Sequence, residues 1–432
     1  MSQLATSASR FPQLRADNIT LDSGSGALGI VLMIIGAAAG AACGFIGYQG
    51  IGNVGMKHAL AAYHIGTMSV LAMCLGALFF CLVFHLLQAG WVATVRRQFE
   101  NVASFLPFAF LLVLPTIIIE IATGGHLFQW LGDAKGTDYL LNKKAIYFFG
   151  LTEVGKGEIP FPSFFVLRIV IYGLIWTYLS RRMVSLGRQQ DIATDASPFA
   201  RARFTAAWGM LVFALTTAFA AFDWLMSLDY KFFSTMWGVY YFAAAAFSSV
   251  AVVVLVLSVL RAKGKLKGAV TEEHFHDLGK LMLTFTIFWA YIAFSQYMLI
   301  WYSNIPEETA YILHRTEHWS NLGILLVVGH FAAPFLILLF RGVKKNYRLL
   351  SIVALWAIFI HMMDMYWIIR PMVYTNPANE PGGSMPFVTE FCGMIAALLI
   401  LVGYLMKRVP SSPLVGVGDP FMKEAINHKN YV

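Results

Sequence analysis

The chain has 432 residues, of which 58% are apolar and only 12% are charged, with a mean hydropathy of +0.67. Soluble domains average about 25% charged residues, so this composition excludes an ordinary soluble protein and indicates an integral membrane protein. The net charge of +8 is spread over many short segments, which favours a role in membrane topology over nucleic-acid binding.

Ten apolar runs of membrane-spanning length follow one another along the chain. Repeated runs of about 20 residues predict helices rather than a β-barrel, so the expected fold class is an all-α integral membrane protein. The first 26 residues are polar and lack the apolar region of a cleavable signal, so we expect the first span to remain as an anchor. The predicted spans are 27–46, 62–88, 102–122, 161–182, 205–222, 234–260, 278–302, 317–340, 348–368 and 387–406.

Lysine and arginine are distributed unevenly between the two sets of connections. The termini and the loops after spans two, four, six and eight hold 21 of them, whereas the remaining loops hold 8. The positive-inside rule therefore predicts that both termini are cytoplasmic. The long connections 123–160 and 369–386 then lie on the outer face, where such loops often cover a site or bind a partner.

Spans two to five can be laid over spans six to nine as a weak parallel repeat. Span five ends in FDWL and span nine carries HMMDMYW, so each places an aspartate beside a tryptophan near its outer end. The repeat predicts two four-helix bundles, flanked by spans one and ten. The expected division is a cytoplasmic N-terminal segment (1–26), the first span and its connection (27–61), the first bundle (62–233), the second bundle (234–386), and the tenth span with its cytoplasmic tail (387–432).

Five ionisable residues of the first bundle lie near the outer face: His64, Glu120, His126, Arg168 and Asp223. Ionisable groups in spans are costly and usually face the bundle interior, where they form ion pairs or carry function. We expect Arg168 to pair with Glu120 or Asp223, and it is also a candidate for touching a ligand. Asp223 and His126 are expected at an interface where a proton can leave to water, so with Glu120 they are the candidate catalytic set.

The joint FDWLMSLDYKFFSTMWG, residues 222–238, surrounds Asp223 with aromatic residues. Its position between two spans fits either a plain aqueous turn or the rim of a site that handles protons or a polar ligand at the outer face. Asp229 and Lys231 lie further from the spans and are predicted to form a solvated turn.

Polar residues in the second bundle form a second candidate set. His361 and Asp364 are three residues apart on span nine and share one helix face. Gln296 lies on span seven, His330 lies on span eight, and His85 ends span two on the cytoplasmic side. Together they predict a proton relay, and the alternatives are a satisfied buried pair and, for His85, a snorkelling side chain.

Two pairs of histidines have a spacing or depth that could suit a metal ion or a haem. His314 and His318 have the i, i+4 spacing that can bind a metal, but no further ligand lies nearby in the sequence, so we predict no metal site. His330 and His361 are the only mid-depth pair that could ligate a b-type haem, although Asp364 beside them suits proton chemistry better. The sequence has no CxxC or CxxCH motif, which argues against a disulfide framework, a covalent haem and a cysteine-ligated cluster. The four cysteines fall inside apolar runs: Cys43, Cys74, Cys81 and Cys392.

Several stretches resemble a known family. FDWLMSLDYKFFSTMWGVYYFAAAAFSS is similar to the joint of the polysulfide-reductase membrane-subunit superfamily, in which an aspartate closes one helix. Within it, three stretches resemble the second quinone-binding-type membrane subunit of bacterial alternative complex III, a quinol:cytochrome c oxidoreductase. They are LQAGWVATVRRQFE (87–100), IPFPSFFVLR at the start of span four, and DLGKLMLTFTIFWAYIAFSQYMLIWYSNIPEET (277–309).

The resemblance, which covers most of spans two to nine, implies a subunit of the bacterial inner membrane with no redox cofactor of its own. It implies menaquinol or ubiquinol near the outer face and proton half-channels through the bundles, with Asp223 at the family's aspartate position. Arg168 and His64 then become candidates for contacting the quinone headgroup. The implied partners are a sister quinol-oxidising membrane subunit, an iron–sulfur subunit, multihaem cytochrome c subunits, a terminal oxidase and lipids.

Two other functions fit the same residues. A proton-coupled secondary transporter would use the intramembrane polar groups and need broken helices at mid-membrane. A purely structural subunit would hold its partners together without handling protons or quinone.

Overall fold

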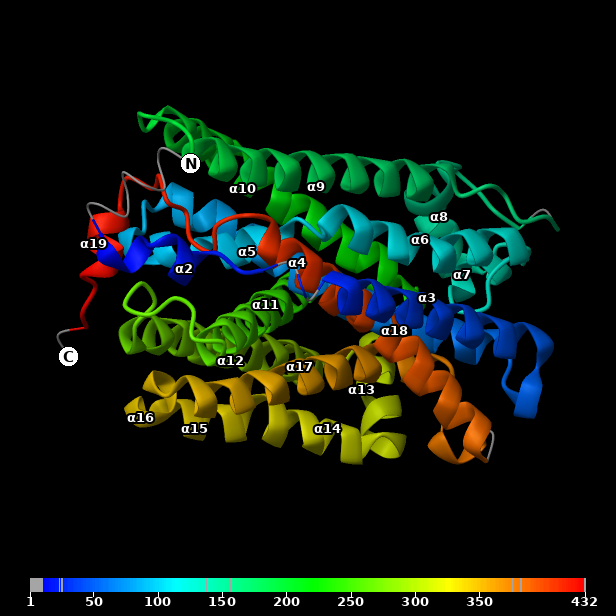
Figure 1. Cartoon of the computed structure of the whole chain (residues 1–432). Helices are drawn as coiled ribbons and strands as arrows, with labels where there is room; N and C mark the ends of the chain where they lie inside the picture. The colour runs from blue at the N-terminus through cyan, green and yellow to red at the C-terminus, as the bar shows by residue number, and fades with distance from the viewer. Residues whose placement is uncertain are drawn as a thin grey trace.

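The computed structural model describes residues 11–22, 24, 26–136, 138–155, 157–374, 376–380 and 383–430. Within these ranges the chain forms helices and no strand, and ten helical segments are long and apolar enough to cross a membrane. The predicted fold class is thus confirmed: the chain is an all-α, multi-pass membrane protein. In chain order the spans are α3 (Gly26–Gln49), α4 (Met56–Leu86), α5 (Arg96–Ala103) continued by α6 (Leu106–Thr123), α9 (Ser163–Gln190), α10 (Ser197–Trp224), α11 (Trp237–Ala262), α12 (Glu272–Ser303), α14 (Ser320–Leu326) continued by η6 (Val327–Ala332) and α15 (Ala333–Leu339), α17 (Tyr347–Ile369) and α18 (Ser384–Arg408) (Figure 1).

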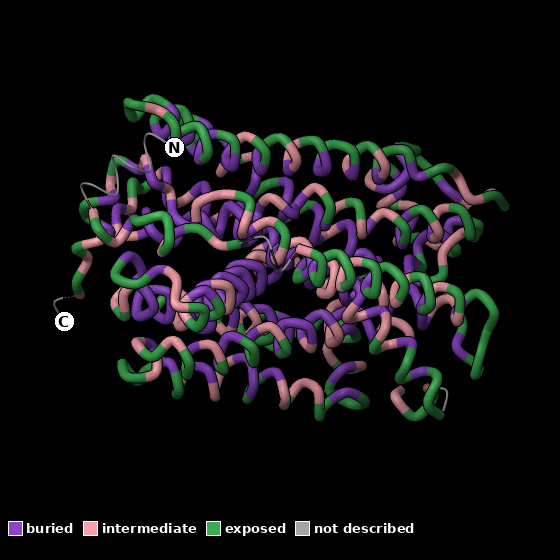
Figure 2. The backbone as a smooth tube through the Cα atoms, viewed as in Figure 1, coloured by how far each residue is buried: buried purple, intermediate pink, exposed green. Residues whose placement is uncertain are grey.

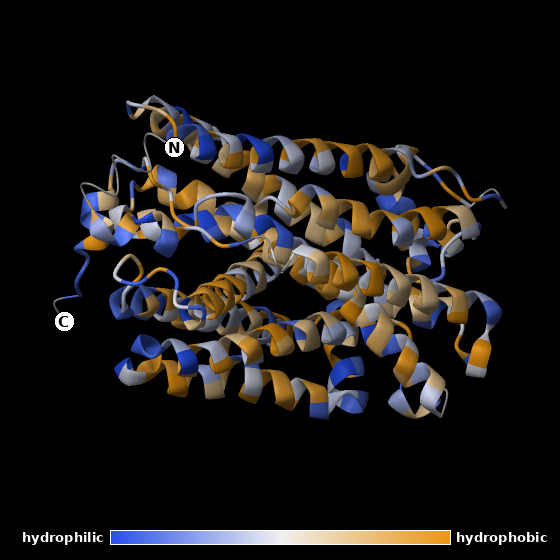
Figure 3. Cartoon of the chain, viewed as in Figure 1, coloured by the Kyte–Doolittle hydropathy of each residue, from blue (hydrophilic) through white to orange (hydrophobic). Residues whose placement is uncertain are grey.

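Several helices extend beyond the predicted spans. The fifth span was expected to begin at residue 205, but α10 begins at Ser197, with Pro198 in its first turn, where the missing N–H costs no helical bond. Hydropathy marks only the part of a helix that needs lipid, and the helix continues through polar residues such as Arg201 at the exposed end. Figure 3 shows this division, with hydrophobic residues along the middle of the spans and hydrophilic residues gathered near their ends.

Shorter helices form the connections and the ends of the chain. Ile19 accepts a backbone hydrogen bond from Leu414 at 2.8 Å, and Asn18 accepts one from Leu266 at 3.0 Å, so both ends of the described chain lie at one end of the bundle. We call this the terminal end and the opposite one the far end. The short elements are η1 (Pro12–Leu14), α2 (Ala16–Ile19), η3 (Ile51–Asn53), η4 (Gly90–Thr94), α7 (Gln129–Asp133), α8 (Tyr139–Phe149), η5 (Met226–Leu228), α13 (Pro306–His318), α16 (Arg341–Lys345), η7 (Arg370–Met372), η8 (Pro377–Asn379), η9 (Val409–Ser411) and α19 (Met422–Ile426).

Eight of the spans form two groups of four, and one helix of each group, α4 and α11, lies at the centre of the molecule. In the first group α4 packs on α6 and α10, and α9 packs on α6 and α10; in the second, α11 packs on α12 and α17, while α15 packs on α12 and α14 on α17. The two groups meet where α4 packs against α11. These two helices are buried along almost their whole length, and Figure 2 shows α11 as a buried helix in the middle of the molecule.

The first and last spans, α3 and α18, pack closely on each other, and α18 also packs on α4. Small residues allow this approach: a Cβ on Gly29 would lie 2.6 Å from the carbonyl oxygen of Gly403, and one on Gly36 would lie 2.6 Å from that of Ala396. Close backbone contact through small residues is the usual basis of helix association in lipid, where no hydrophobic effect drives helices together.

Gly76 on α4 is expected to be intolerant of any side chain. A Cβ there would lie 2.0 Å from the backbone carbonyl oxygen of Ala245 on α11, so the two central helices would have to separate. We expect Gly76→Ala to destabilise the protein by about 1–3 kcal/mol, the usual cost of overpacking, despite alanine's better helix propensity. Thermal unfolding in detergent measures this. Gly44→Ala is the matched control, because nothing lies within 4 Å of that position, and an equal melting temperature for both variants would contradict the prediction.

Candidate functional site

The first candidate site lies at the far end of the first bundle, around Asp223 near the end of α10. Arg168 on α9 donates to both carboxylate oxygens, from Nε at 2.8 Å and from Nη2 at 2.7 Å. Tyr172, one turn further along α9, donates its hydroxyl to Asp223 Oδ2 at 2.7 Å. A bidentate arginine–carboxylate pair is a strong, geometrically specific interaction, and Asp223 rather than Glu120 is the partner of Arg168.

The surroundings of this pair close it off from water. Arg168 Nη1 donates to the backbone carbonyl of Tyr147 at 2.6 Å, and the guanidinium lies 3.9 Å from the centre of the Tyr147 ring. The Asp223 side chain is 0% exposed and that of Arg168 is 17% exposed. Asp223 was expected at a water-facing interface, but it lies inside the bundle, because α8 and its Tyr147 cover it.

Glu120 stabilises the turn that follows α6 and does not pair with Arg168. Its carboxylate accepts hydrogen bonds of 2.9–3.0 Å from the backbone N–H groups of His126, Leu127 and Phe128. The glycines at 124–125 make this possible, since both adopt positive φ and turn the chain back over the end of α6. The His126 side chain is exposed at this turn. The structure therefore does not bring Glu120 to Asp223, and the expected catalytic set is divided.

Replacing Glu120 with glutamine is expected to loosen this turn. The amide keeps the shape of the side chain, but it loses the charge and offers N–H groups where one carboxylate oxygen accepted. Hydrogen bonds to charged groups contribute about 1.5–3 kcal/mol, so we expect amide hydrogen exchange at residues 126–128 to accelerate by roughly tenfold or more. His126→Ala is the control, because its exposed ring contributes no bond to the turn. Unchanged protection in Glu120→Gln would refute this role.

His64 connects the first turns of α4 with the end of α10. Its Nε2 donates to the backbone carbonyl of Trp224 at 2.9 Å, and its ring packs edge-on to Phe128 with centroids 6.1 Å apart. His64 is therefore next to the Asp223 site through the backbone. This bond occupies Nε2 of His64, whereas its Nδ1 has no hydrogen-bond partner among the described residues. Arg168, the other candidate for a quinone contact, donates to Asp223 and to the Tyr147 carbonyl.

The second candidate site lies inside the second bundle, around Asp364 on α17. Tyr240 on α11 donates its hydroxyl to Asp364 Oδ1, and Trp289 on α12 donates its indole N–H to Oδ2 at 3.1 Å. Asp364 is 0% exposed, and no lysine or arginine among the described residues lies within ion-pair distance of it. The two candidate sites thus each hold a buried aspartate, one near the end of α10 that is neutralised by a guanidinium and one near the end of α17 that is held only by neutral donors.

Two buried histidines lie beside Asp364. His330 stacks on Trp289 with ring centroids 3.8 Å apart, and both its ring nitrogens lack a hydrogen-bond partner in the described part of the chain. His361 Nε2 donates to the carbonyl of Ser69 on α4 at 3.3 Å, whereas its Nδ1 has no such partner. His330, Asp364 and His361 are therefore brought close through Trp289 and α17, although no direct bond joins the carboxylate to either imidazole.

His330 lies in η6, a π-helical turn within span eight. Pro334 follows it and has no N–H, so the carbonyl of Gly329, five residues earlier, has no π-helical donor. Trp356 Nε1 donates to that carbonyl instead, at 2.7 Å. Single π-helical turns inside α-helices are frequent at functional sites, and this one sets the position of His330.

The remaining relay candidates lie apart from Asp364. Gln296 Oε1 accepts from the Ser234 hydroxyl at 3.0 Å, at the joint that precedes α11. His85 donates from Nδ1 to the carbonyl of Cys81, one turn back on α4, at 2.7 Å. Each of these residues is satisfied locally.

Sequence reasoning missed a buried arginine at the far end. Arg315 on α13 is 1% exposed and lies 3.5 Å from the centre of the Tyr311 ring. It donates to the backbone carbonyls of Tyr311, Trp367 and Ile368, at 3.1, 3.3 and 2.9 Å. Burial lowers the pKa of Arg315. The sequence does hold a sign of this residue. Arg315 is a basic residue in one of the connections that, by the positive-inside rule, hold few lysines and arginines.

A second missed arginine, Arg370, is also fully buried at the far end. Its Nε lies 3.0 Å from carboxylate oxygens of both Glu380 and Glu390, and its Nη2 lies 2.8 Å from Nδ1 of His58. It therefore ties α4, α17 and α18 together.

The long loop after α6 is tied to the joint before α11. Tyr230 donates to carboxylate oxygens of Asp133 at 2.9 Å and Asp138 at 3.1 Å, and Lys144 donates to the Tyr230 carbonyl. Backbone hydrogen bonding, chiefly from the N–H of Leu141, lowers the pKa of Asp138, whereas burial raises the pKa of Tyr230. The Asp229 side chain accepts from the N–H of Lys231 and its carbonyl accepts from the N–H of Phe232, as expected of a turn.

The terminal end has a buried charge cluster that sequence analysis treated only as topology. Arg97 pairs with Glu100 at 2.9 Å and with Asp191, while Arg96 pairs with Asp419 in the C-terminal tail. Burial raises the pKa of Asp191 to about 6, although Arg97 acts in the opposite direction. The cluster joins α5, α9 and the tail.

Comparisons with known proteins add no assignment. No family model matches the chain, and no curated protein matches it significantly. Across the described ranges, no three His, Cys, Asp or Glu side chains gather to hold a metal ion, and the His314 and His318 rings lie 6.2 Å apart.

Proposed function

We propose that the chain is a membrane subunit of a bacterial quinol:cytochrome c oxidoreductase, of the alternative complex III kind, and that its second bundle transfers protons. Partner subunits carry the haems and iron–sulfur clusters, and a sister membrane subunit oxidises the quinol. The subunit lies in the inner membrane with both termini, and hence the terminal end, in the cytoplasm. The excess of basic residues in the terminal-end connections supports this orientation.

The observation that carries this proposal is the state of Asp364. A carboxylate buried among apolar residues without a cation is costly, so it is retained only where its proton is used or where its hydrogen bonds repay the cost. Asp364 has Tyr240 as a neighbour that can both donate and accept a proton, and His330 and His361 nearby carry unbonded ring nitrogens. Acid, phenol and imidazole are the groups from which membrane proton relays are built.

The chemistry of quinol oxidation is consistent with proton transfer in this chain and electron transfer in its partners. Oxidation of a quinol releases two electrons and two protons, and the electrons need an acceptor nearby. The chain offers no cysteine motif for a cluster or covalent haem, so the electrons pass to a partner. The protons need an interior group that can take and release them, and Asp364 is such a group.

The first bundle has an architectural role in this proposal. Arg168, Asp223 and Glu120 use their hydrogen bonds within the chain, and His64 uses its Nε2, although its Nδ1 has no partner among the described residues. A purely structural subunit is therefore the second candidate function, because these closed networks are what a scaffold requires. The state of Asp364 is the feature that a scaffold does not explain.

Purification through an affinity tag on this chain tests the assignment. Native membranes are solubilised gently, and the product is examined by mass spectrometry, by its haem absorption and by quinol-dependent reduction of cytochrome c. We expect multihaem and iron–sulfur subunits to co-purify with that activity. A chain that emerges alone and colourless would overturn the electron-transfer assignment, and proton-coupled solute uptake in proteoliposomes would then be the assay.

A further inference from the structure

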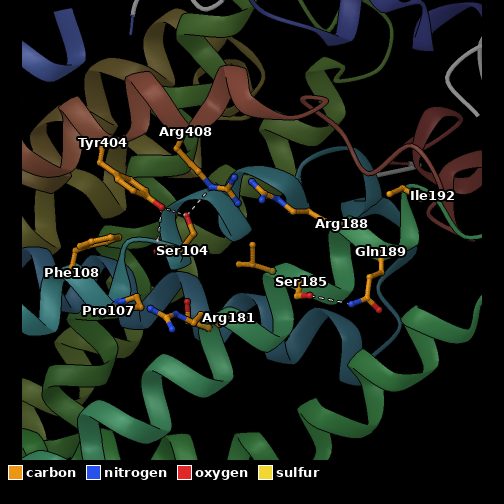
Figure 4. A pocket seen from close by; sticks show the side chains of 12 residues that line it. Ser104, Pro107, Phe108, Arg181, Ser185, Arg188, Gln189, Ile192, Tyr404 and Arg408 are labelled. Atoms are coloured by element: carbon orange, nitrogen blue, oxygen red, sulfur yellow. Dashed lines mark hydrogen bonds between the residues drawn. The ribbon is translucent and has the colours of Figure 1, made fainter. Parts of the chain in front are cut away.

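A cleft of about 530 Å³ opens at the terminal end between α6, α9 and α18. It lies away from both carboxylate sites, and the proposed function does not use it. Figure 4 shows its lining, which comes from the junction of α5 and α6, the last turns of α9 and the end of α18. We call it the arginine cleft, after Arg181, Arg188 and Arg408.

The three arginines give the cleft a positive charge that the protein does not balance. No aspartate or glutamate lines it, and neither Arg181 nor Arg188 has an ion-pair partner among the residues that the structure describes. In Figure 4 the guanidinium groups of Arg188 and Arg408 are directed toward one another from different helices. Like charges that face each other repel, and an anion between them would convert this repulsion into attraction.

Neutral donors complete the polar part of the cleft. Arg408 Nε donates to the Ser104 hydroxyl at 3.1 Å, which holds the guanidinium against the cleft wall, and the Tyr404 hydroxyl lies 3.0 Å from the same oxygen. Ser185 lies between Arg181 and Arg188 on α9. Positions 181, 185 and 188 are spaced by four and three residues, so they share one helix face. Planar guanidinium groups beside hydroxyls match the oxygens of a phosphate.

The other part of the cleft is apolar. Phe108 and Ile192 line it and are 50% and 78% exposed, and Val184 lies beside them. Arg181 and Arg188 are about 10 Å apart along α9, a distance comparable to the thickness of the headgroup layer. Both lie after the apolar part of the span, near its end. A ligand that is anionic at one end and apolar at the other fits this arrangement better than a free anion does.

We propose that the arginine cleft binds an anionic phospholipid, with the phosphate between Arg181, Arg188 and Arg408 and the acyl chains along Phe108. Basic pockets between spans on the cytoplasmic side are a recurring form of lipid recognition. The recognised chemistry is a phosphate diester, and inorganic phosphate is the alternative source of the same oxygens.

The test uses the full chain purified in detergent and follows thermal unfolding during titration with dioctanoyl phosphatidylglycerol. Dioctanoyl phosphatidylcholine and inorganic phosphate are titrated in parallel. We expect phosphatidylglycerol to raise the melting temperature in a saturable way, while the other two have little effect. Arg188→Gln should weaken the apparent affinity by about tenfold, the expected loss of one charge-assisted contact. Arg188→Lys should recover part of it.

Two controls make the outcome decisive. Arg203→Gln removes an exposed arginine on α10 outside the cleft and should leave the titration unchanged. The Arg188 side chain has no hydrogen bond or ion pair within the described chain, so its variants should fold, and an unshifted melting temperature without lipid verifies this. Equal responses to phosphate and to phosphatidylglycerol would overturn the lipid assignment. Wild-type affinity in Arg188→Gln would overturn the site.

Discussion

Replacing Asp364 with asparagine is expected to slow quinol-dependent cytochrome c reduction by the intact complex by about 10²-fold, the lower end of what a positioned acid–base group contributes. The amide oxygen can accept from Trp289 and the amide nitrogen can donate to Tyr240, so the packing of α17 is preserved. What is lost is the ability to exchange a proton at this position. Steady-state rates of the purified complex, with proton release followed by a pH-sensitive dye in proteoliposomes, measure the effect.

The matched control for this experiment is Asp229→Asn, which makes the same chemical change in the half-buried turn before α11. The Asp229 side chain accepts a local backbone hydrogen bond from Lys231 and does not contact Asp364, so the rate should stay at the wild-type level. A wild-type rate and proton yield in Asp364→Asn would remove Asp364 from the proton path and favour the scaffold role. Equal losses in both variants would indicate a defect in assembly.

Replacing Arg168 with leucine is expected to destabilise the chain by about 3–5 kcal/mol, the cost of leaving a buried charge without its partner. Asp223 would remain inside the bundle, with Tyr172 as its one remaining side-chain donor among the described residues. Thermal unfolding in detergent, followed by tryptophan fluorescence, measures the change. Trp176 and Trp224 both pack against Tyr172 and report on this region.

The double variant Arg168→Leu/Asp223→Asn separates the ion pair from the packing of its members. Because the charge left behind in Arg168→Leu causes most of the loss, removing it should restore more than half of the stability. Additive losses in the two single variants and the double variant would show that the two residues are not energetically coupled. This outcome would contradict the structural role given to the pair.

The ten spans could be predicted because hydropathy and helix rise act over whole segments. The partner of Arg168 could be narrowed to two carboxylates from depth alone. The choice between them depended on the Gly-Gly turn at 124–125, which gives the buried Glu120 carboxylate three backbone donors and leaves Asp223 as the partner of Arg168. The hydrogen bonds of such a turn leave no mark on the hydrophobic periodicity of the sequence.

The donors to Asp364 could not be predicted. Tyr240 and Trp289 resemble the many aromatic residues that anchor spans at the membrane surface, and only tertiary packing turns their polar atoms toward α17. The expected relay through His361 was based on helix spacing, but the His361 ring donates across the interface to Ser69 on α4 instead. Helix spacing identifies a shared face, whereas the neighbouring helix decides what that face contacts.

The glycine contact between α3 and α18 has a consequence for biogenesis. The ribosome makes α3 first among the spans and α18 last, so the small-residue face around Gly29 is synthesised long before its Gly403 counterpart. At roughly 5–20 residues per second, the wait lasts some tens of seconds. During that interval lipid or an insertion factor must cover the face. A nascent chain that stops before residue 384 would leave it open permanently, which gives quality-control proteases a means of distinguishing truncated products from finished ones.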